Sequence, residues 1–220
     1  MESRAEKLIV AERYKLLIGC IVPRPIAFVS TLSPDGKCPN LAPFSFFNGV
    51  GSDPMMILFC VSNKPDGSEK DTLRNCKPAS EGGQGQFVVN ASVEPYVRKV
   101  AAAAEDSAYG VSEFELVGLA TEPSVVVAPP RVKDAPWCFE CETMQILRTN
   151  PGRPGGGNVV LGRVIHVKVD DALLNERMHV NPDKLRAVGR MGGITYARTR
   201  ERFELPMGLD ALTKELPFKD

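Results

Sequence analysis

The chain has 220 residues, of which 27 are basic and 27 are acidic, so its formal net charge at neutral pH is zero. Nucleic-acid binding depends mainly on cations that neutralise phosphates, so a balanced chain without a basic stripe argues against that function. No apolar run approaches the roughly 20 residues that span a bilayer. The first ten residues mix acidic and basic side chains and lack the apolar core of a signal peptide. We therefore predict a cytoplasmic protein that binds neither nucleic acid nor membrane.

The length predicts one domain over residues 1–220, and the 19 glycines and 18 prolines favour short strands joined by turns. Apolar residues at helical spacing predict a short helix around Tyr14 to Leu17. Residues 26–32 and 39–44 are predicted to be strands. Residues 34–37 (PDGK) predict the turn between them, because proline sets φ and glycine tolerates a positive φ. Together they predict a β-hairpin.

Further strands are predicted at residues 55–61 and 87–91, which are apolar runs of strand length. Residues 70–76 predict a short helix capped by Asp71 or Thr72. Residues 94–104 predict a helix most clearly, because a proline falls in its first turn and a run of alanines follows.

Three later segments are predicted to be extended, namely residues 114–121, 137–148 and 158–169. The glycine-rich loop 151–157 is predicted to join the last two as antiparallel neighbours. Residues 182–220 predict a mixture of short pieces. Neighbouring strands lie too close in sequence for helical crossovers, which favours an antiparallel sheet or barrel.

The cysteines predict free thiols rather than a redox or metal site. Cys138 and Cys141 have C-x-x-C spacing, but their surroundings are strand-like, and residues three apart in a strand point to opposite faces. A redox pair needs its first cysteine at a helix N-terminus, and a zinc site needs a second ligand pair. Neither is found in the sequence, so no metal is predicted.

The two histidines are His166 and His179. His166 falls in an alternating strand and is either a wall residue or a general acid. His179 lies in a polar stretch that predicts a surface position. No serine–histidine–acid constellation follows from the sequence, so His166 is the single catalytic candidate.

The segment from Arg24 to Asn48 carries the clearest sign of a ligand. Ser45-Phe46-Phe47-Asn48 places two bulky aromatic residues between hydrogen-bonding side chains. A planar ligand with an apolar body and polar edges fits such a cluster, although ordinary hairpin packing also explains it. Downstream, Lys70 and Thr72 offer an ammonium and a hydroxyl, which are suited to a phosphate monoester.

The string PRPIAFVSTLSPDGKCPNLAPFSFFNGVGSDPMMILF, from residue 23, closely resembles the start of the flavin-reductase-like family of FMN-binding split barrels. Later matches are KDTLRN from residue 70, FVVN from 87, EFELVGL from 113, GRVIHVKVDD from 162 and VGRMGGITYAR from 188. The resemblance covers about nine-tenths of the chain. It implies a mainly β fold with short helices, in the form of a closed, antiparallel, Greek-key-like split barrel. It also implies non-covalent FMN and a homodimer with the flavin near the subunit interface.

The resemblance also assigns cofactor-binding positions. These are Arg24, Ser30, Thr31, Leu32, Ser45, Phe46, Phe47, Asn48, Lys70, Thr72, Asn90, Arg190 and Tyr196. Ser30 to Leu32 match the strand end along the flavin ring, Ser45 to Asn48 match the grip on the ribityl chain, and Lys70 with Thr72 match the phosphate site. The loops at 81–85 and 151–157 depart from the family pattern. They leave undecided how a substrate reaches the flavin, but they do not affect the prediction of FMN binding.

The resemblance implies hydride transfer from NADH or NADPH to flavin, with an oxygenase or an electron-transfer protein as partner. Such a reaction needs no acid–base residue, because the cofactor carries the chemistry. One alternative is an FMN-containing electron carrier resembling flavoredoxin, with little nicotinamide activity. Another is a barrel that has lost its flavin, against which Ser45, Asn48, Lys70 and Thr72 argue.

Overall fold

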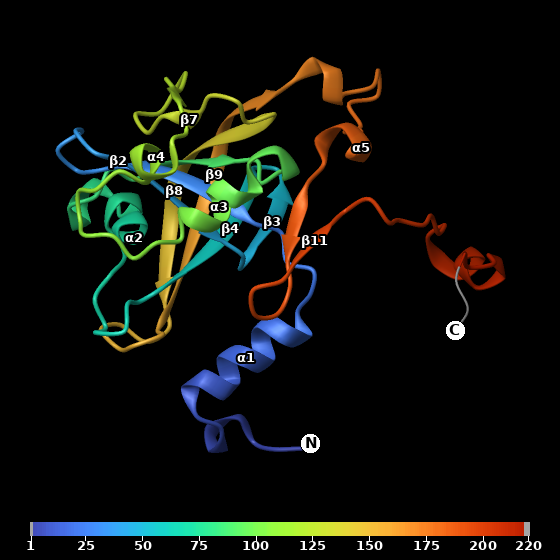
Figure 1. Cartoon of the computed structure of the whole chain (residues 1–220), viewed down its shortest axis with the longest axis horizontal. Coiled ribbons are helices and arrows are strands. Elements are labelled where there is room, and N and C mark those ends of the chain that lie inside the picture. The colour runs from blue at the N-terminus through green and yellow to red at the C-terminus, as the bar shows by residue number, and fades with distance from the viewer. Residues whose placement is uncertain (1, 218–220) are drawn as a thin grey trace.

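The computed structural model describes residues 2–217, and its centre is a seven-stranded antiparallel sheet (Figure 1). The strand order is β2-β1-β5-β8-β9-β4-β3. The bounds are β1 Ala27–Leu32, β2 Pro39–Phe44, β3 Phe47–Ser52, β4 Met55–Ser62, β5 Gln86–Asn90, β8 Trp137–Arg148 and β9 Gly157–Val169. Two small ladders complete the strands. They pair β6 (Thr121–Glu122) with β7 (Arg131–Val132), and β10 (Val188–Arg190) with β11 (Tyr196–Arg198).

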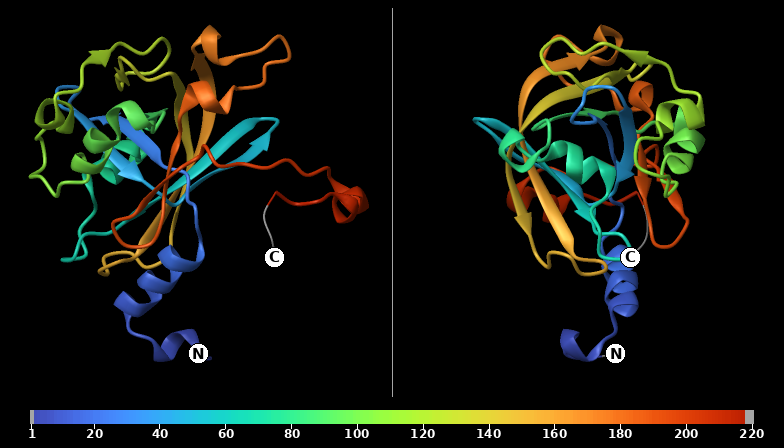
Figure 2. Two further views of the ribbon diagram at one scale, coloured as in Figure 1. Left: turned by 45° about the vertical axis from the view of Figure 1, so that its right-hand side comes forward. Right: turned by 90° about the vertical axis from the view of Figure 1, so that its left-hand side faces the viewer.

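The helices are short and lie around this sheet. They are α1 Val10–Cys20, α2 Asp71–Cys76, α3 Val97–Ala102, α4 Glu113–Val117 and α5 Pro182–Leu185. Short 3-10 helices occur at η1 Ala5–Lys7, η2 Ala79–Glu81, η3 Glu94–Tyr96, η4 Asp171–Leu173 and η5 Gly208–Thr213. The sheet is strongly curved, and α2, α3 and α4 lie together on one side of it (Figures 1 and 2).

The sheet returns toward itself at one corner without closing. Its edge strands β2 and β3 are consecutive in sequence and are joined by Ser45 and Phe46, whose carbonyl accepts the N–H of Cys60 at 2.8 Å. No ladder joins β2 to β3 within residues 2–217. A closed barrel was expected, and the seam beside β2 is open instead.

The prolines of β2 explain the open seam. Leu41 directs its N–H away from β1, to the Glu113 Oε2 atom at 3.0 Å. In a strand, the residues two positions before and after Leu41 direct their backbone N–H positions to the same side. These are Pro39 and Pro43, which have no N–H to donate. The outer edge of β2 therefore cannot continue the sheet.

Alternation along β1 divides the core into two clusters. Ala27 and Val29 pack in one cluster with Phe59 and Phe87, whose ring centroids lie 5.2 Å apart. Phe28 packs in the other cluster, with Leu41 and Val100 among its members. Burial of each valine, leucine or phenylalanine side chain in these clusters stabilises the fold by about 1.5–3 kcal/mol.

Most of the predicted elements are confirmed. The hairpin of β1 and β2, the strands β4 and β5, and the β8–β9 hairpin match their expected ranges closely. The extended prediction for residues 114–121 is wrong, because residues 113–117 form α4, which buries Phe114 and ends at Gly118 with a φ of +62°. Strand β3 was missed, since its sequence FNGVGS looks like a turn.

The predicted cap of α2 is also wrong. Lys70 occupies the N-cap position, and no side chain caps the helix there. Thr72 lies within the helix, and its hydroxyl accepts a hydrogen bond from Asn40.

The two terminal segments project from the body (Figures 1 and 2). Helix α1 buries Ile18 alone. The segment around η5 buries no residue. Among residues 2–217, no helix is long and apolar enough to cross a membrane.

Candidate functional site

An open pocket lies along the outer edge of β2, with about 460 Å³ of empty space that includes open solvent. Its walls come from β2, the start of α2, the segment after α3 and the start of α4. The lining residues are Asn40, Ala42, Pro43, Phe44, Lys64, Lys70, Asp71, Thr72, residues 103–107 and Glu113. Because no strand can pair with this edge, the pocket stays open to a ligand.

A buried polar network forms the base of the pocket. The Asn40 Nδ2 atom donates to Thr31 Oγ1 at 3.2 Å and to Thr72 Oγ1 at 3.0 Å. Asn75 Nδ2 also donates to Thr31 Oγ1, at 3.0 Å. Thr72 accepts from Asn40, so its own hydroxyl proton remains to be donated.

Lys70 supplies an available positive charge beside Thr72. The other lysine of the pocket, Lys64, forms an ion pair with Asp106, with an Nζ to Oδ1 distance of 3.3 Å. No ion pair joins Lys70 to another residue of the described part of the chain. An ammonium and a hydroxyl next to each other suit a phosphate group.

Two carboxyl groups sit at the edge of the same pocket. Burial raises the pKa of Asp71, whose Oδ1 atom is buried without a hydrogen-bond partner. Burial also raises the pKa of Glu113, although the N–H of Leu41 partly offsets this by donating to the carboxylate. Both groups are thus easier to protonate than ordinary carboxyls.

The predicted Ser45 to Asn48 cluster lies at the corner between β2 and β3. Ser45 and Phe46 form the connection, and both are partly exposed. Phe47 packs against the cluster of core residues that contains Phe59. Asn48 is exposed, and its side chain accepts the N–H of Gly49 at 2.9 Å. The corner continues from Phe44 at the end of the pocket.

Arg24 is buried behind this corner. Its guanidinium donates to the carbonyls of Ile18, of Ile21 at 2.9 Å and of Met191 at 2.9 Å, and to Ser45 Oγ at 3.2 Å. The expected cofactor-binding Arg24 therefore links α1 and the β10–β11 turn to Ser45. Ser45 accepts this bond, so its own hydroxyl proton can be donated elsewhere.

Arg190 and Tyr196 face each other across the β10–β11 hairpin. The Arg190 guanidinium lies 4.5 Å from the centroid of the Tyr196 ring. Arg190 also pairs with Arg24 through the backbone. This hairpin adjoins the Ser45 corner through Arg24, whereas neither Arg190 nor Tyr196 lines the pocket.

Ser30 and Asn90 point to the opposite face of the sheet from Thr31. Ser30 Oγ donates to the carbonyl of Pro130 at 2.6 Å, and Asn90 Oδ1 accepts the N–H of Val132 at 2.9 Å. Both side chains were expected at the cofactor. Their polar groups are buried against residues 130–132 and anchor that segment, and neither side chain lines the pocket. Leu32 ends β1 and is partly buried.

His166 also lies away from the pocket. It pairs with Glu140 across β8 and β9, with 3.4 Å between His166 Nδ1 and Glu140 Oε1. Glu140 is fully buried, and its carboxylate accepts the N–H groups of Val125 and Val126, the closest at 2.7 Å. The candidate catalytic histidine thus belongs to a cluster that holds residues 125–132.

The cysteines are all free, and burial raises the pKa of both Cys138 and Cys141. These two belong to different core clusters. This agrees with the prediction that they point to opposite faces. Among the residues that the structure describes, no group of three or more histidine, cysteine or acidic residues could hold a metal ion.

The two unusual loops are both packed. Gln84 Nε2 donates to the carbonyls of Ser33 and Pro34 at 3.0 Å, which holds residues 81–85 against the β1–β2 turn. In the 151–157 loop, Asn63 Nδ2 donates to the carbonyl of Arg153 at 3.0 Å. Neither loop lines the pocket.

The sequence did not single out Asn40, Lys64, Glu113 or residues 103–107 as parts of a site. The hairpin register offered one signal, because Asn40 lies directly opposite Thr31. The other residues come from segments far away in sequence, and only the fold brings them to the edge of β2.

The curved antiparallel sheet, with an open pocket along its edge strand β2, has the fold of the split-barrel flavoproteins. The chain belongs to the flavin reductase like domain family, whose model matches residues 18–189. A relative from Aquifex aeolicus (strain VF5) is 40% identical over 84% of this chain and 89% of its own length.

Two solved structures are similar in sequence and fold. Nitrilotriacetate monooxygenase component B from Bacillus cereus is 32% identical with a TM-score of 0.84, over 93% of this chain and 98% of that one. The 2-nitrobenzoate 2-nitroreductase NbaA of Pseudomonas fluorescens is 30% identical with a TM-score of 0.80, over 95% and 97% of the two chains. Flavoredoxin of Desulfovibrio vulgaris (Miyazaki F) shares the fold, with 21% identity, a TM-score of 0.69 and coverage of 86% and 93%.

Proposed function

We propose that the chain binds FMN non-covalently in the β2-edge pocket and transfers hydride from NADH or NADPH to the flavin. The observation that carries this proposal is Lys70, a cation without an ion pair in the described structure, next to the Thr72 hydroxyl in an open pocket. Family membership supports a flavin as the ligand.

The residues of the pocket fit the phosphate end of FMN, and the adjacent Ser45 to Asn48 corner, which does not line the pocket, would meet the ring end. Lys70 and Thr72 would hold the phosphate, with Asn40 orienting the Thr72 hydroxyl. The apolar side chains of Ala42, Pro43 and Phe44 line the middle. The corner from Ser45 to Asn48 then offers aromatic surface and hydroxyl and amide groups toward a ring with polar edges. We retain Thr31 and Leu32 as residues that border this site.

The protein's own contribution is to bind and orient. When bound, FMN supplies the ring that accepts a hydride from the reduced nicotinamide. The buried network of Thr31, Asn40, Thr72 and Asn75 fixes the phosphate end, and Arg24 fixes Ser45 at the other end. Holding two reactants in place lowers the barrier without any proton transfer from the protein. His166 has no part in this scheme.

The test is to purify the full chain without added flavin, titrate it with FMN, and follow oxidation of NADH and of NADPH. We expect saturable FMN binding and flavin-dependent consumption of at least one nucleotide. Tight FMN with negligible consumption of both nucleotides would favour the electron carrier over the reductase. A protein that neither binds FMN nor gains thermal stability from it would contradict both proposals.

We also propose that residues 1–220 form one domain that acts as a homodimer. Large apolar side chains are exposed on α1 and around η5, including Ile9, Leu17, Leu209 and Leu212. Apolar surface that is exposed in a monomer commonly marks an interaction site. The electron acceptor would be an oxygenase or another redox protein, because one similar structure is a monooxygenase component.

A further inference from the structure

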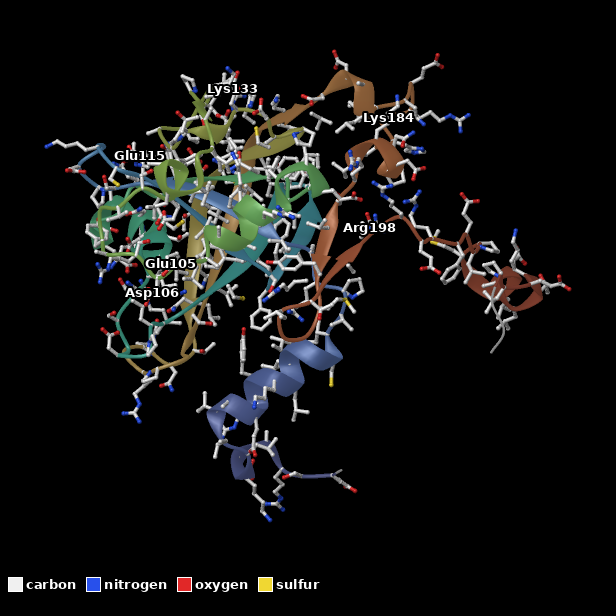
Figure 3. The ribbon with its side chains drawn as sticks, in the orientation of Figure 1. Glu105, Asp106, Glu115, Lys133, Lys184 and Arg198 are labelled. Atoms are coloured by element: carbon white, nitrogen blue, oxygen red, sulfur yellow. The ribbon has the colours of Figure 1, made fainter. Side chains whose placement is uncertain are left out.

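The mouth of the pocket is lined by carboxylates that the proposed reaction does not use. Glu105 and Asp106 follow α3, are exposed, and line the pocket together with Lys70 and Thr72. Figure 3 shows both residues on the side of the molecule that carries Glu115, whereas Lys184 and Arg198 lie on the opposite side. A ligand that extends from Lys70 past residues 103–107 must meet this acidic rim.

The unpaired cations of the pocket can neutralise one phosphate group and no more. The cations of the pocket are Lys64 and Lys70, and Lys64 is already paired with Asp106 at 3.3 Å. No ion pair joins Glu105 to any residue in the part of the chain that the structure describes. Once one phosphate occupies Lys70, a second phosphate at the rim would find no free cation in the pocket.

The carboxyl groups around the pocket influence one another. Burial is the main cause of the raised pKa of Asp71, and the negative charge of Asp106 raises it further. Burial likewise raises the pKa of Glu113, to which the charge of Asp71 adds. These carboxyl groups are thus close enough to interact across the pocket, and a second phosphate without a cation beside it would be repelled too.

Building on the proposed function, we propose that Glu105 and Asp106 determine the flavin specificity of the pocket, favouring FMN over FAD. In FAD, a second phosphate and an adenosine are attached to the phosphate that Lys70 would hold. They would have to leave the pocket past the 103–107 segment. Repulsion from the rim penalises this dinucleotide more than the mononucleotide, so selectivity arises from rejection of the larger ligand.

The experiment titrates the purified full chain, freed of flavin, with FMN, FAD and riboflavin at low ionic strength. We expect FMN to bind at least about tenfold more tightly than FAD, which corresponds to about 1.4 kcal/mol. Glu105→Gln should leave FMN affinity unchanged and tighten FAD severalfold. Asp106→Asn should tighten both flavin nucleotides, because it frees Lys64. Raising the salt concentration should reduce the preference of the wild type for FMN over FAD, because salt screens the exposed charges of the rim.

Glu115→Gln is the matched control, since Glu115 lies on α4 and does not line the pocket. It should change neither affinity. Equal binding of FMN and FAD by the wild type would overturn the specificity inference alone. The same follows if Glu105→Gln leaves the ratio of the two affinities unchanged. Failure of all three flavins to bind would overturn the proposed function, and the specificity inference with it.

Discussion

Two buried polar networks lie on opposite faces of β1, and they serve different ends. On one face, Thr31 accepts hydrogen bonds from Asn40 and Asn75 beside an open pocket. On the other face, Ser30 donates to the carbonyl of Pro130 beneath a packed segment. The first network leaves Thr72 with a proton to donate to a ligand. The second network holds residues 125–132 through several side-chain hydrogen bonds.

The difference follows from strand geometry. Successive side chains in a strand point to opposite faces, so two adjacent hydroxyl residues need not share a role. We call the set of Thr31, Asn40, Thr72 and Asn75 the pocket network. We call the set of Ser30, Asn90 and Glu140 the anchor network. Variants of the anchor network should reduce stability, and variants at the pocket should change flavin binding.

The largest effect is expected for Glu140→Ala in the anchor network. Its carboxylate is fully buried, accepts two backbone N–H groups and lies 3.7 Å from the Arg131 guanidinium. Removing one partner of a buried pair leaves the other uncompensated, so the free energy of unfolding should fall by about 3–5 kcal/mol. Urea denaturation measures this loss.

Glu142→Ala is the matched control, because Glu142 lies on the same strand in a partly exposed ion pair with Arg163 at 2.9 Å. It should cost less than about 1 kcal/mol. If Glu140→Ala is no more destabilising than this control, the anchor network does not stabilise the fold as described.

Next in size is Lys70→Ala at the pocket. Loss of a charge-assisted hydrogen bond to the phosphate should weaken FMN binding by about 1.5–3 kcal/mol. Riboflavin has no phosphate, so its affinity should not change. A fluorescence titration with both flavins measures the difference, and Lys133→Ala serves as a control far from the pocket. Unchanged FMN affinity in Lys70→Ala would remove Lys70 from the site.

The adjacent pair Thr31→Val and Ser30→Ala tests the comparison directly. Thr31→Val leaves two buried amide donors without their acceptor, and should cost about 1–3 kcal/mol of stability. It should also weaken FMN binding, because Asn40 then keeps only its bond to Thr72 and orients that hydroxyl less firmly. Ser30→Ala should cost about 1 kcal/mol and leave FMN affinity unchanged. Unfolding curves and FMN titrations of both variants distinguish the roles of the two faces of β1. An equal loss of FMN affinity in both variants would contradict the assignment of Thr31 to the pocket network and of Ser30 to the anchor network.

The smallest effect is the pH dependence at Asp71. Burial raises the pKa of Asp71 above its ordinary value of 3.8. As the pH rises from below 3.8 to above the raised pKa of the folded protein, the unfolded chain loses the Asp71 proton first, so the free energy of unfolding falls. Asp71→Asn removes this effect and should raise the melting temperature relative to the wild type at pH 7, but not near pH 3. A difference that is the same at both pH values would show that the charge of Asp71 is not the cause.

The sequence predicts local elements well where turn chemistry is explicit. The Pro34 to Lys37 turn between two β-prone runs gives the β1–β2 hairpin in its observed register. It fails where apolar spacing is ambiguous. Phe114 and Val117 fit one face of a helix, whereas Phe114 and Leu116 fit one face of a strand. Val117 packs with Phe114 against the core and Leu116 is exposed, which decides for α4.

For the site, the sequence points to Lys70 and Thr72 and to the Ser45 corner, and the structure places these around one edge strand. It could not separate Ser30 from Thr31, because both match the same family motif and only their orientation distinguishes them. It could not find Glu113 either. The contact of Glu113 with Leu41 depends on two prolines that leave the edge of β2 unpaired.

The most direct test of the central claim is a crystal structure of the full chain with FMN. The phosphate oxygens should lie at hydrogen-bond distance, about 2.7–3.2 Å, from Lys70 Nζ and Thr72 Oγ1. The flavin ring should lie toward the Ser45 to Asn48 corner. A phosphate bound elsewhere, such as at Arg190 on the β10–β11 hairpin, would contradict the β2-edge pocket as the flavin site.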